Sequence, residues 1–174
     1  MKVLETQHLI VRHLRVDDLA DLLEVCGDPD VMLYMGDGRP LSREQTEKWI
    51  EKSQVNYRQH GFGCFAVVAR ESHKFVGFCG LVNPSFGKVP EAEIIYALKK
   101  EHWGQGLARE VAGAMIEFGF GQCHLQRIVA TIAPENSASV RIVERLGLKC
   151  QGDRTDEHGL PEVVYAIENP EQGF

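Results

Sequence analysis

The segment Trp103-Gly104-Gln105-Gly106-Leu107-Ala108 joins a predicted strand at residues 92–98 to a predicted helix at residues 106–121. The first amide groups of a helix have no partner inside the helix, and the positive end of the helix dipole lies beside them. Glycine leaves room for a ligand to approach this backbone, and Ala108 is small enough to let the ligand lie against the first helical turn. The segment therefore predicts a turn that binds phosphate.

On both sides of this turn, the chain alternates between the two common hydrophobic periods. Apolar residues spaced by three and four indicate helices, and short runs of β-branched and aromatic residues indicate strands. Ser42 and Gln45 form an S-x-x-Q capping pattern, and Asn136 and Gly147 suit the start and the end of a short helix. The predicted strands are 9–14, 65–68, 75–81, 92–98, 126–133, 148–154 and 162–167, and the predicted helices are 17–25, 42–59, 106–121 and 136–146.

This order predicts an α/β (α+β) fold in one domain, residues 1–174. We expect a central mixed sheet of about seven strands flanked by about four helices, because each amphipathic helix has to cover a sheet face. Gly27 and Pro29 are expected to end the first helix, and residues 83–90, which contain two prolines and a glycine, are expected to form a loop.

The composition is that of an ordinary globular protein, and it argues against several classes of function. Of the 174 residues, 44% are apolar and 25% are charged, and the formal net charge of -6 gives no broad basic surface for nucleic acid. No run approaches the roughly 20 apolar residues that cross a bilayer, and no secretory signal can be read at the start. We therefore expect a cytoplasmic protein that binds neither nucleic acid nor membrane.

The cysteines and histidines show no pattern typical of a disulfide framework or a metal site. Five cysteines are scattered without a C-x-x-C pair, and the seven histidines include no H-x-x-x-H spacing. We expect free thiols and no metal.

Five stretches of the chain resemble one known family. They are Leu4-Glu5-Thr6 with Leu9-Ile10-Val11-Arg12, Asp28-Pro29-Asp30-Val31-Met32, Glu93 with Tyr96, the glycine turn, and Glu135-Asn136-Ser137-Ala138-Ser139 leading to Leu146-Gly147-Leu148. The turn resembles the motif Q/R-x-x-G-x-G/A with which GCN5-related N-acetyltransferases (GNAT) bind pyrophosphate, although Trp103 stands where the general motif has Gln or Arg. The whole chain looks most like the RimJ/RimL-like branch, which acetylates ribosomal-protein N-termini.

This resemblance implies acetyl-coenzyme A as co-substrate and a splayed sheet that receives it. In the family, strands equivalent to 92–98 and 126–133, the fourth and fifth of the sheet, diverge, and the thioester enters the gap. Turn amides hold the pyrophosphate, the backbone near the end of the fourth strand pairs with the pantetheine arm, and a residue of the last helix contacts the coenzyme from the other side. The residues implied here are Leu98, Trp103, Gly104, Gln105, Gly106, Leu107, Ala108 and Asn136.

Transfer to an amine needs a neutral nitrogen, a polarised carbonyl and a proton for the departing thiolate. Glu93 is the candidate general base, because its strand would run beside the coenzyme; a plain surface carboxylate is the alternative. Ser139 is the candidate to protonate or solvate the leaving sulfur, because many relatives place a tyrosine or serine there; the alternative is a helix residue that bonds to backbone. Tyr96 and Tyr165 are further candidates for this role.

The resemblance implies an amine-bearing acceptor, either a peptide N-terminus or a small molecule such as a polyamine or an antibiotic. An α-amine with a pKa near 8 is neutral in about a tenth or more of molecules at pH 7, whereas lysine is neutral in fewer than about one in a thousand. A peptide N-terminus therefore demands less of the base. Both a monomer and a homodimer are compatible with the sequence.

Two other classes of function compete with this interpretation. A nucleotide-dependent oxidoreductase would also use glycines at a helix start, but Arg109 stands where its third glycine belongs, and His124 stands where its ribose-binding acid belongs. A module that keeps the acetyltransferase fold and binds coenzyme without turnover is the second alternative.

Overall fold

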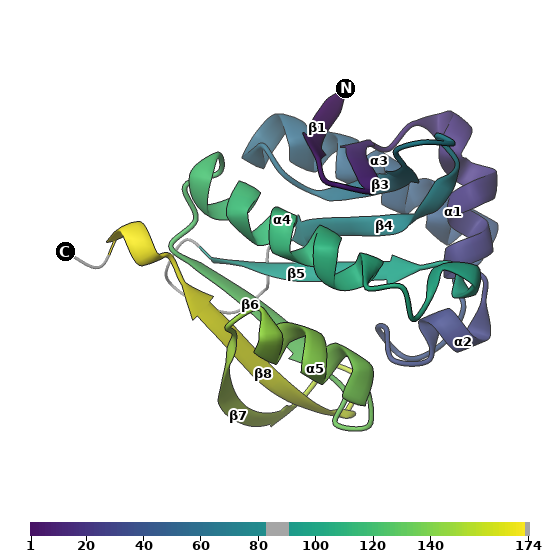
Figure 1. Cartoon of the computed structure of the whole chain (residues 1–174). Helices are drawn as coiled ribbons and strands as arrows, with labels where there is room; N and C mark the ends of the chain where they lie inside the picture. The colour runs from purple at the N-terminus through teal and green to yellow at the C-terminus, as the bar shows by residue number, and fades with distance from the viewer. Residues whose placement is uncertain (83–90, 173–174) are drawn as a thin grey trace.

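The computed structural model describes residues 1–82 and 91–172, so the loop predicted at 83–90 lies outside the described residues. Within these residues, eight strands form one sheet in the order β1-β2-β3-β4-β5-β6-β8-β7 (Figure 1). The strands are β1 (Lys2–Glu5), β2 (Leu9–His13), β3 (Cys64–Ala69), β4 (Phe75–Val82), β5 (Glu91–Leu98), β6 (Arg127–Ile132), β7 (Lys149–Thr155) and β8 (Pro161–Glu168). The helices are α1 (Leu19–Cys26), α2 (Pro29–Met32), α3 (Arg43–His60), α4 (Leu107–Gly121) and α5 (Ser137–Arg145).

Two short elements go beyond the predicted set. β1 is a four-residue strand that pairs with β2, and its exposed end residues Lys2 and Glu5 leave too little apolar alternation to signal a strand. α2 begins at Pro29, with Asp28 as its N-cap, whereas the sequence pattern treats Pro29 only as the end of the preceding helix. Proline is favoured at the first helical position, because the missing N–H has no helical partner there.

The helices cover both faces of the sheet, as expected for an α/β domain (Figure 1). β3 shows why: Phe65 and Val67 belong to the core beneath α4 and α5, while Ala66 and Val68 belong to the core beneath α1 and α3. Successive side chains of a strand point to opposite faces, so a strand buried on both faces reads as a continuous apolar run.

The predicted helix ends are confirmed. At α3, Gln45 N donates to Ser42 Oγ at 3.2 Å, and Ser42 N donates to Gln45 Oε1 at 2.8 Å. At α5, Ser139 N donates to Asn136 Oδ1 at 3.3 Å, and Gly147 follows the helix with φ +91°. These contacts satisfy amide and carbonyl groups that a helix leaves unpaired at its ends.

The predicted splay is present between β5 and β6. All neighbouring strands are antiparallel except this pair, which is parallel and extends only from Glu91 opposite Arg127 to Glu93 opposite Val129. β5 continues to Leu98 along β4 alone, and β6 continues to Ile132 along β8 alone. The sheet therefore opens in its middle, beyond Glu93.

None of the helices in residues 1–82 and 91–172 combines the length and the hydrophobicity that crossing a bilayer requires. Over the same two ranges, no three His, Cys, Asp or Glu side chains gather in a way that would hold a metal ion.

A buried ion pair connects β2 to the start of α1. Both terminal nitrogens of Arg12 donate to the carboxylate of Asp18 at 2.8 Å, and Arg15 N donates to Asp18 Oδ2 at 2.8 Å. Burial raises the pKa of Asp18, but these hydrogen bonds outweigh burial and lower it below its ordinary value. The charged form of Asp18 therefore stabilises the folded protein.

We expect Asp18→Asn to destabilise the fold by about 3 kcal/mol at pH 7, because Arg12 keeps a buried charge without its partner. The contribution of the wild-type carboxylate is fully present above pH 3.8, the ordinary pKa, and is lost as the pH falls through the lowered native pKa. The difference between wild type and variant in urea unfolding should therefore shrink in acid. Glu5→Gln, which removes the exposed ion pairs with Lys2 and Arg70, is the control and should change the unfolding midpoint far less; an equal effect of both variants would contradict the assignment.

Candidate active site

The glycine turn between β5 and α4 is open to solvent. Gly104 and Gly106 have φ values of +74° and +77°, in the left-handed region that favours glycine, and a Cβ built at either position meets nothing within 4 Å. Gly106 is the N-cap of α4, and no side chain caps the helix there. The first amides of α4 are thus available to an anion.

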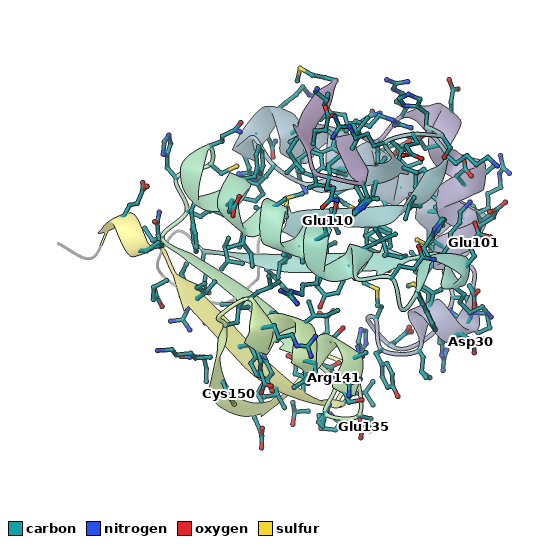
Figure 2. All side chains as sticks on the ribbon, viewed as in Figure 1. Asp30, Glu101, Glu110, Glu135, Arg141 and Cys150 are labelled. Atoms are coloured by element: carbon teal, nitrogen blue, oxygen red, sulfur yellow. The ribbon has the colours of Figure 1, made fainter. Side chains whose placement is uncertain are left out.

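Polar contacts from distant segments hold this turn in place. Glu110, one turn into α4, accepts hydrogen bonds from Thr6 Oγ1 at 2.5 Å and His8 N at 2.9 Å (Figure 2). Burial raises the pKa of Glu110, but these bonds and the His8 ring lower it overall, so the carboxylate stays charged. On the other side, Lys100 Nζ donates to Asp30 Oδ2 of α2 at 2.7 Å. The start of α4 is therefore anchored to the β1–β2 turn, and the chain just before it to α2.

The glycine turn lies at one end of a cleft of about 650 Å³, here called the coenzyme cleft. Its other walls come from α2 with the chain that follows, from β5 and from α5. Six of the eight predicted coenzyme-binding residues line it, namely Leu98, Trp103, Gly104, Gly106, Ala108 and Asn136. Gln105 and Leu107 are not among the described residues that line it, so they would contribute through their backbone amides.

The side chains of Trp103 and Gln105 are turned back onto the preceding residues. Trp103 Nε1 donates to the Leu98 carbonyl at 2.9 Å, and half of the Trp103 side chain remains exposed. Gln105 Nε2 donates to the Glu101 carbonyl at 3.2 Å. One lone pair of the Leu98 carbonyl is thus used by the protein itself, so a pantetheine arm beside β5 would share this acceptor or use its neighbours.

A second cavity, of about 740 Å³, lies on the other side of the splayed strands and is here called the acceptor cavity. Its walls are the segment Leu33 to Gly38, parts of β5 and β6, and the hairpin of β7 and β8. The sequence pattern gives no readable code for these walls. It misses Thr131, Arg154 and Glu162, because they come together only when β8 pairs with β6 on one side and β7 on the other.

Carboxylates predominate in the acceptor cavity. Five acidic side chains line it, against Lys52 and Arg154; the acids are Asp37, Glu93, Asp156, Glu157 and Glu162. Arg154 forms an ion pair with Glu162 across the hairpin. The remaining imbalance favours a cationic or amine-bearing ligand over an anionic one.

Glu93 lies in the acceptor cavity at the point where β5 and β6 separate. It occupies the last position of β5 that pairs with β6, and Thr131 Oγ1 of β6 donates a hydrogen bond to its carboxylate. Burial raises the pKa of Glu93 above its ordinary value, and the negative charge of Glu162 adds to this, while Thr131 and Arg154 oppose it. A raised pKa makes this carboxylate a stronger base than an exposed one.

The two cavities meet at a shared wall. Six residues line both, namely Leu33, Tyr34, Met35, Tyr96, Asn136 and Ser139. Glu93 lines the acceptor cavity alone, whereas the glycine turn belongs to the coenzyme cleft alone. The structure therefore brings Glu93, Asn136 and Ser139 around one space, while Tyr165 of β8 is buried and lines neither cavity.

Comparison with known proteins agrees with this architecture. Residues 8–149 match the model of the acetyltransferase (GNAT) domain. The uncharacterized protein YkkB of Bacillus subtilis is 31% identical over 146 residues, which cover 83% of this chain and 84% of that protein. A GNAT-family acetyltransferase from Bacillus anthracis has a crystal structure with a TM-score of 0.82 and 27% identity, covering 97% of this chain and 99% of that one.

A more distant structure shares the fold. RimL, a ribosomal L7/L12 α-N-protein acetyltransferase in complex with coenzyme A, is 16% identical, with a TM-score of 0.81 and coverage of 97% and 98% of the two chains. This fold, the open glycine turn and the family match over residues 8–149 lead to one conclusion. The chain belongs to the GNAT family and is an acetyl-coenzyme A-dependent N-acetyltransferase.

Proposed function

We propose that the chain transfers the acetyl group of acetyl-coenzyme A, bound in the coenzyme cleft, directly to a primary amine in the acceptor cavity. The observation that carries this proposal is the shared wall of the two cavities, where Tyr96, Asn136 and Ser139 face both. A thioester that enters from the glycine turn and an amine that enters beside Glu93 would meet there. No covalent enzyme intermediate is needed, because the nucleophile and the thioester are held together.

The glycine turn suits the pyrophosphate of the coenzyme. Its backbone is exposed, both glycines leave open space, and the free amides of the first turn of α4 provide donors with the helix dipole behind them. Asn136, across the cleft, would contact the coenzyme from α5, although its side-chain oxygen already caps that helix.

Glu93 and Ser139 take separate roles in this proposal. Glu93, directly or through one water, removes a proton from the amine, because it lies on the acceptor side with a raised pKa. The nitrogen attacks the thioester carbonyl, the C–S bond breaks, and the electron pair stays on sulfur. Ser139 lies at the shared wall, where it can protonate or solvate that sulfur.

We propose a peptide N-terminal α-amine as the acceptor. The activity of RimL, a ribosomal L7/L12 α-N-protein acetyltransferase, and the resemblance to its branch support this choice. So does the chemistry, because an α-amine is neutral about a hundred times more often than lysine at pH 7 and makes a modest base sufficient. The carboxylates of the acceptor cavity also suit polyamines and aminoglycoside-type antibiotics, which form the second candidate class.

The acceptor is tested by incubating the protein and acetyl-coenzyme A with peptides of varied N-terminal residue, polyamines and amine-bearing antibiotics. Intact-mass analysis should show an added acetyl group on peptides, and blocking the α-amine should abolish it. If only polyamines or antibiotics are acetylated, the peptide α-amine is wrong as the acceptor and the second candidate class replaces it. Intact coenzyme binding without any product across the panel would contradict acetyl transfer itself.

Gly106→Val should weaken coenzyme A binding by at least tenfold, measured by isothermal titration calorimetry. The side chain both obstructs the approach of the pyrophosphate and strains a residue with φ +77°.

Gly61→Val is the matched control for backbone strain. Gly61 also has φ +77° and open space around a built Cβ, but it ends α3 and lines neither cavity. Its variant should be destabilised by a similar amount and bind coenzyme A normally. Equal affinity of the Gly106 and Gly61 variants for coenzyme A would contradict the proposal that this turn binds the pyrophosphate.

Glu93→Gln should lower kcat roughly 100-fold and leave coenzyme affinity unchanged, because the amide cannot accept the proton of the amine. In the wild type, kcat should fall as the pH drops through the raised pKa of Glu93, and this acid limb should lie above pH 4.5, the ordinary value. The variant should lose the limb. Glu117→Gln, at an exposed position of α4 outside both cavities, should behave as wild type; an unchanged profile for the Glu93 variant would exclude it as the base.

A further inference from the structure

Three residues with hydroxyl groups line both cavities, namely Tyr34, Tyr96 and Ser139. The sulfur that leaves during acetyl transfer would be released at this shared wall, so its proton has to come from a group that reaches the same space. Tyr34 is 42% exposed in the segment after α2. Tyr96, by contrast, is partly buried on β5, three residues beyond the last pair with β6, and therefore lies where the sheet is open.

Tyr96 and Ser139 come from different elements of the fold and lie together at the shared wall. Tyr96 is opposite Cys79 on β4, while Ser139 is in the first turn of α5. Burial raises the pKa of the Tyr96 phenol, and a side-chain hydrogen bond with Ser139 opposes this. The phenol therefore keeps its proton at neutral pH and is oriented by a neighbour from another element.

We propose that Tyr96 donates the proton to the leaving sulfur of the coenzyme and that Ser139 is a positioning residue that orients the Tyr96 hydroxyl and solvates the sulfur. This assignment rests on the proposed direct transfer between the two cavities.

The relative acidity of the two hydroxyl groups decides between them. A general acid works best when its pKa is not far above the pH at which the enzyme operates. A phenol has a pKa near 10 and a thiol one near 8.5, whereas an aliphatic hydroxyl is a far weaker acid than either. Ser139 alone could therefore stabilise a thiolate by hydrogen bonding, but Tyr96 is the group of the pair that can supply a proton.

The proton balance of the step is complete with these groups. The amine nitrogen forms a bond to the carbonyl carbon and loses one proton to Glu93. The C–S bond breaks, its electron pair stays on sulfur, and the sulfur takes the phenolic proton of Tyr96. The tyrosinate regains a proton from water, and Glu93 releases its proton to water, so the products are an amide and free coenzyme A.

Hydroxylamine provides a probe that separates the two proton transfers. It is already neutral at pH 7 and small enough to enter the acceptor cavity, so no base is needed to free its nitrogen before the attack, whereas the sulfur still needs a proton donor. With acetyl-coenzyme A and hydroxylamine, after subtraction of the uncatalysed rate, Tyr96→Phe should lower kcat roughly 100-fold. Glu93→Gln should lower it far less, and coenzyme A affinity should stay within about threefold in both.

Three further variants sharpen this test. Ser139→Ala should lower kcat about tenfold, the effect of losing one oriented hydrogen bond. In the Tyr96→Phe background the same change should cost less than tenfold, because only the solvation of the sulfur is left to lose. The thioester of a more acidic aryl thiol should recover most of the loss in Tyr96→Phe, because its thiolate leaves without a proton. Tyr165→Phe, which removes a tyrosine hydroxyl outside both cavities, should retain the wild-type rate.

Each remaining outcome overturns a defined claim. A larger loss in Ser139→Ala than in Tyr96→Phe would make Ser139 the donor, and a wild-type rate in Tyr96→Phe would remove Tyr96 from the chemistry while leaving acetyl transfer intact. If the wild type accelerates neither hydroxylamine nor any acceptor of the amine panel, the proposed function fails and this assignment fails with it.

Discussion

The early end of the parallel pairing between β5 and β6 is the constraint on which the site depends. The two strands share only the positions from Glu91 to Glu93, and each then follows its antiparallel neighbour. Strand edges inside a domain have unpaired backbone groups that require polar partners. An extended ligand with amide groups, such as pantetheine, can provide such partners. The acceptor cavity and the coenzyme cleft meet beside this opening, where Tyr96 of β5 lines both.

Contacts with distant segments of the chain hold the glycine turn in position next to the opening between β5 and β6. Glu110 anchors the start of α4 to the β1–β2 turn through Thr6 and His8, and Lys100 connects the chain before the turn to α2. The amides proposed to bind phosphate are therefore placed by contacts with the first 30 residues, which contribute no residue to the motif itself. The glycines leave the backbone of the turn open to a ligand, and the contacts of Glu110 and Lys100 fix where that backbone lies.

The charges around the opening match the expected course of acetyl transfer. The amine would enter a cavity in which carboxylates outnumber cations, beside a half-buried Glu93 whose pKa is raised by burial. The sulfur would leave beside Tyr96 and Ser139, where the coenzyme cleft begins. The proposed base therefore lines the acceptor cavity alone, while the proposed acid and Ser139 also line the coenzyme cleft.

Local patterns in the sequence were sufficient for the class of fold and for the turn. Caps such as Ser42 with Gln45, and the change of hydrophobic period along the chain, report on contacts a few residues apart, so they could be read without the tertiary structure. β1 and α2 were not predicted, because each has only four residues and so short a segment shows no hydrophobic periodicity. The resemblance to a family supplied the splay and the candidate roles of Glu93 and Ser139.

Only the tertiary structure decided which side chains share a space. Thr131, Arg154 and Glu162 lie around Glu93 because β6, β7 and β8 pair in one register, and that register depends on contacts between residues far apart in the chain. Tyr96 of β5 and Ser139 of α5 are also far apart in the chain, with α4 and β6 between them, and only the tertiary fold brings them together. The sequence by itself determined the glycine turn at the start of α4, because its motif is local; the packing of distant strands determined which side chains surround Glu93, because those residues are far apart in the chain.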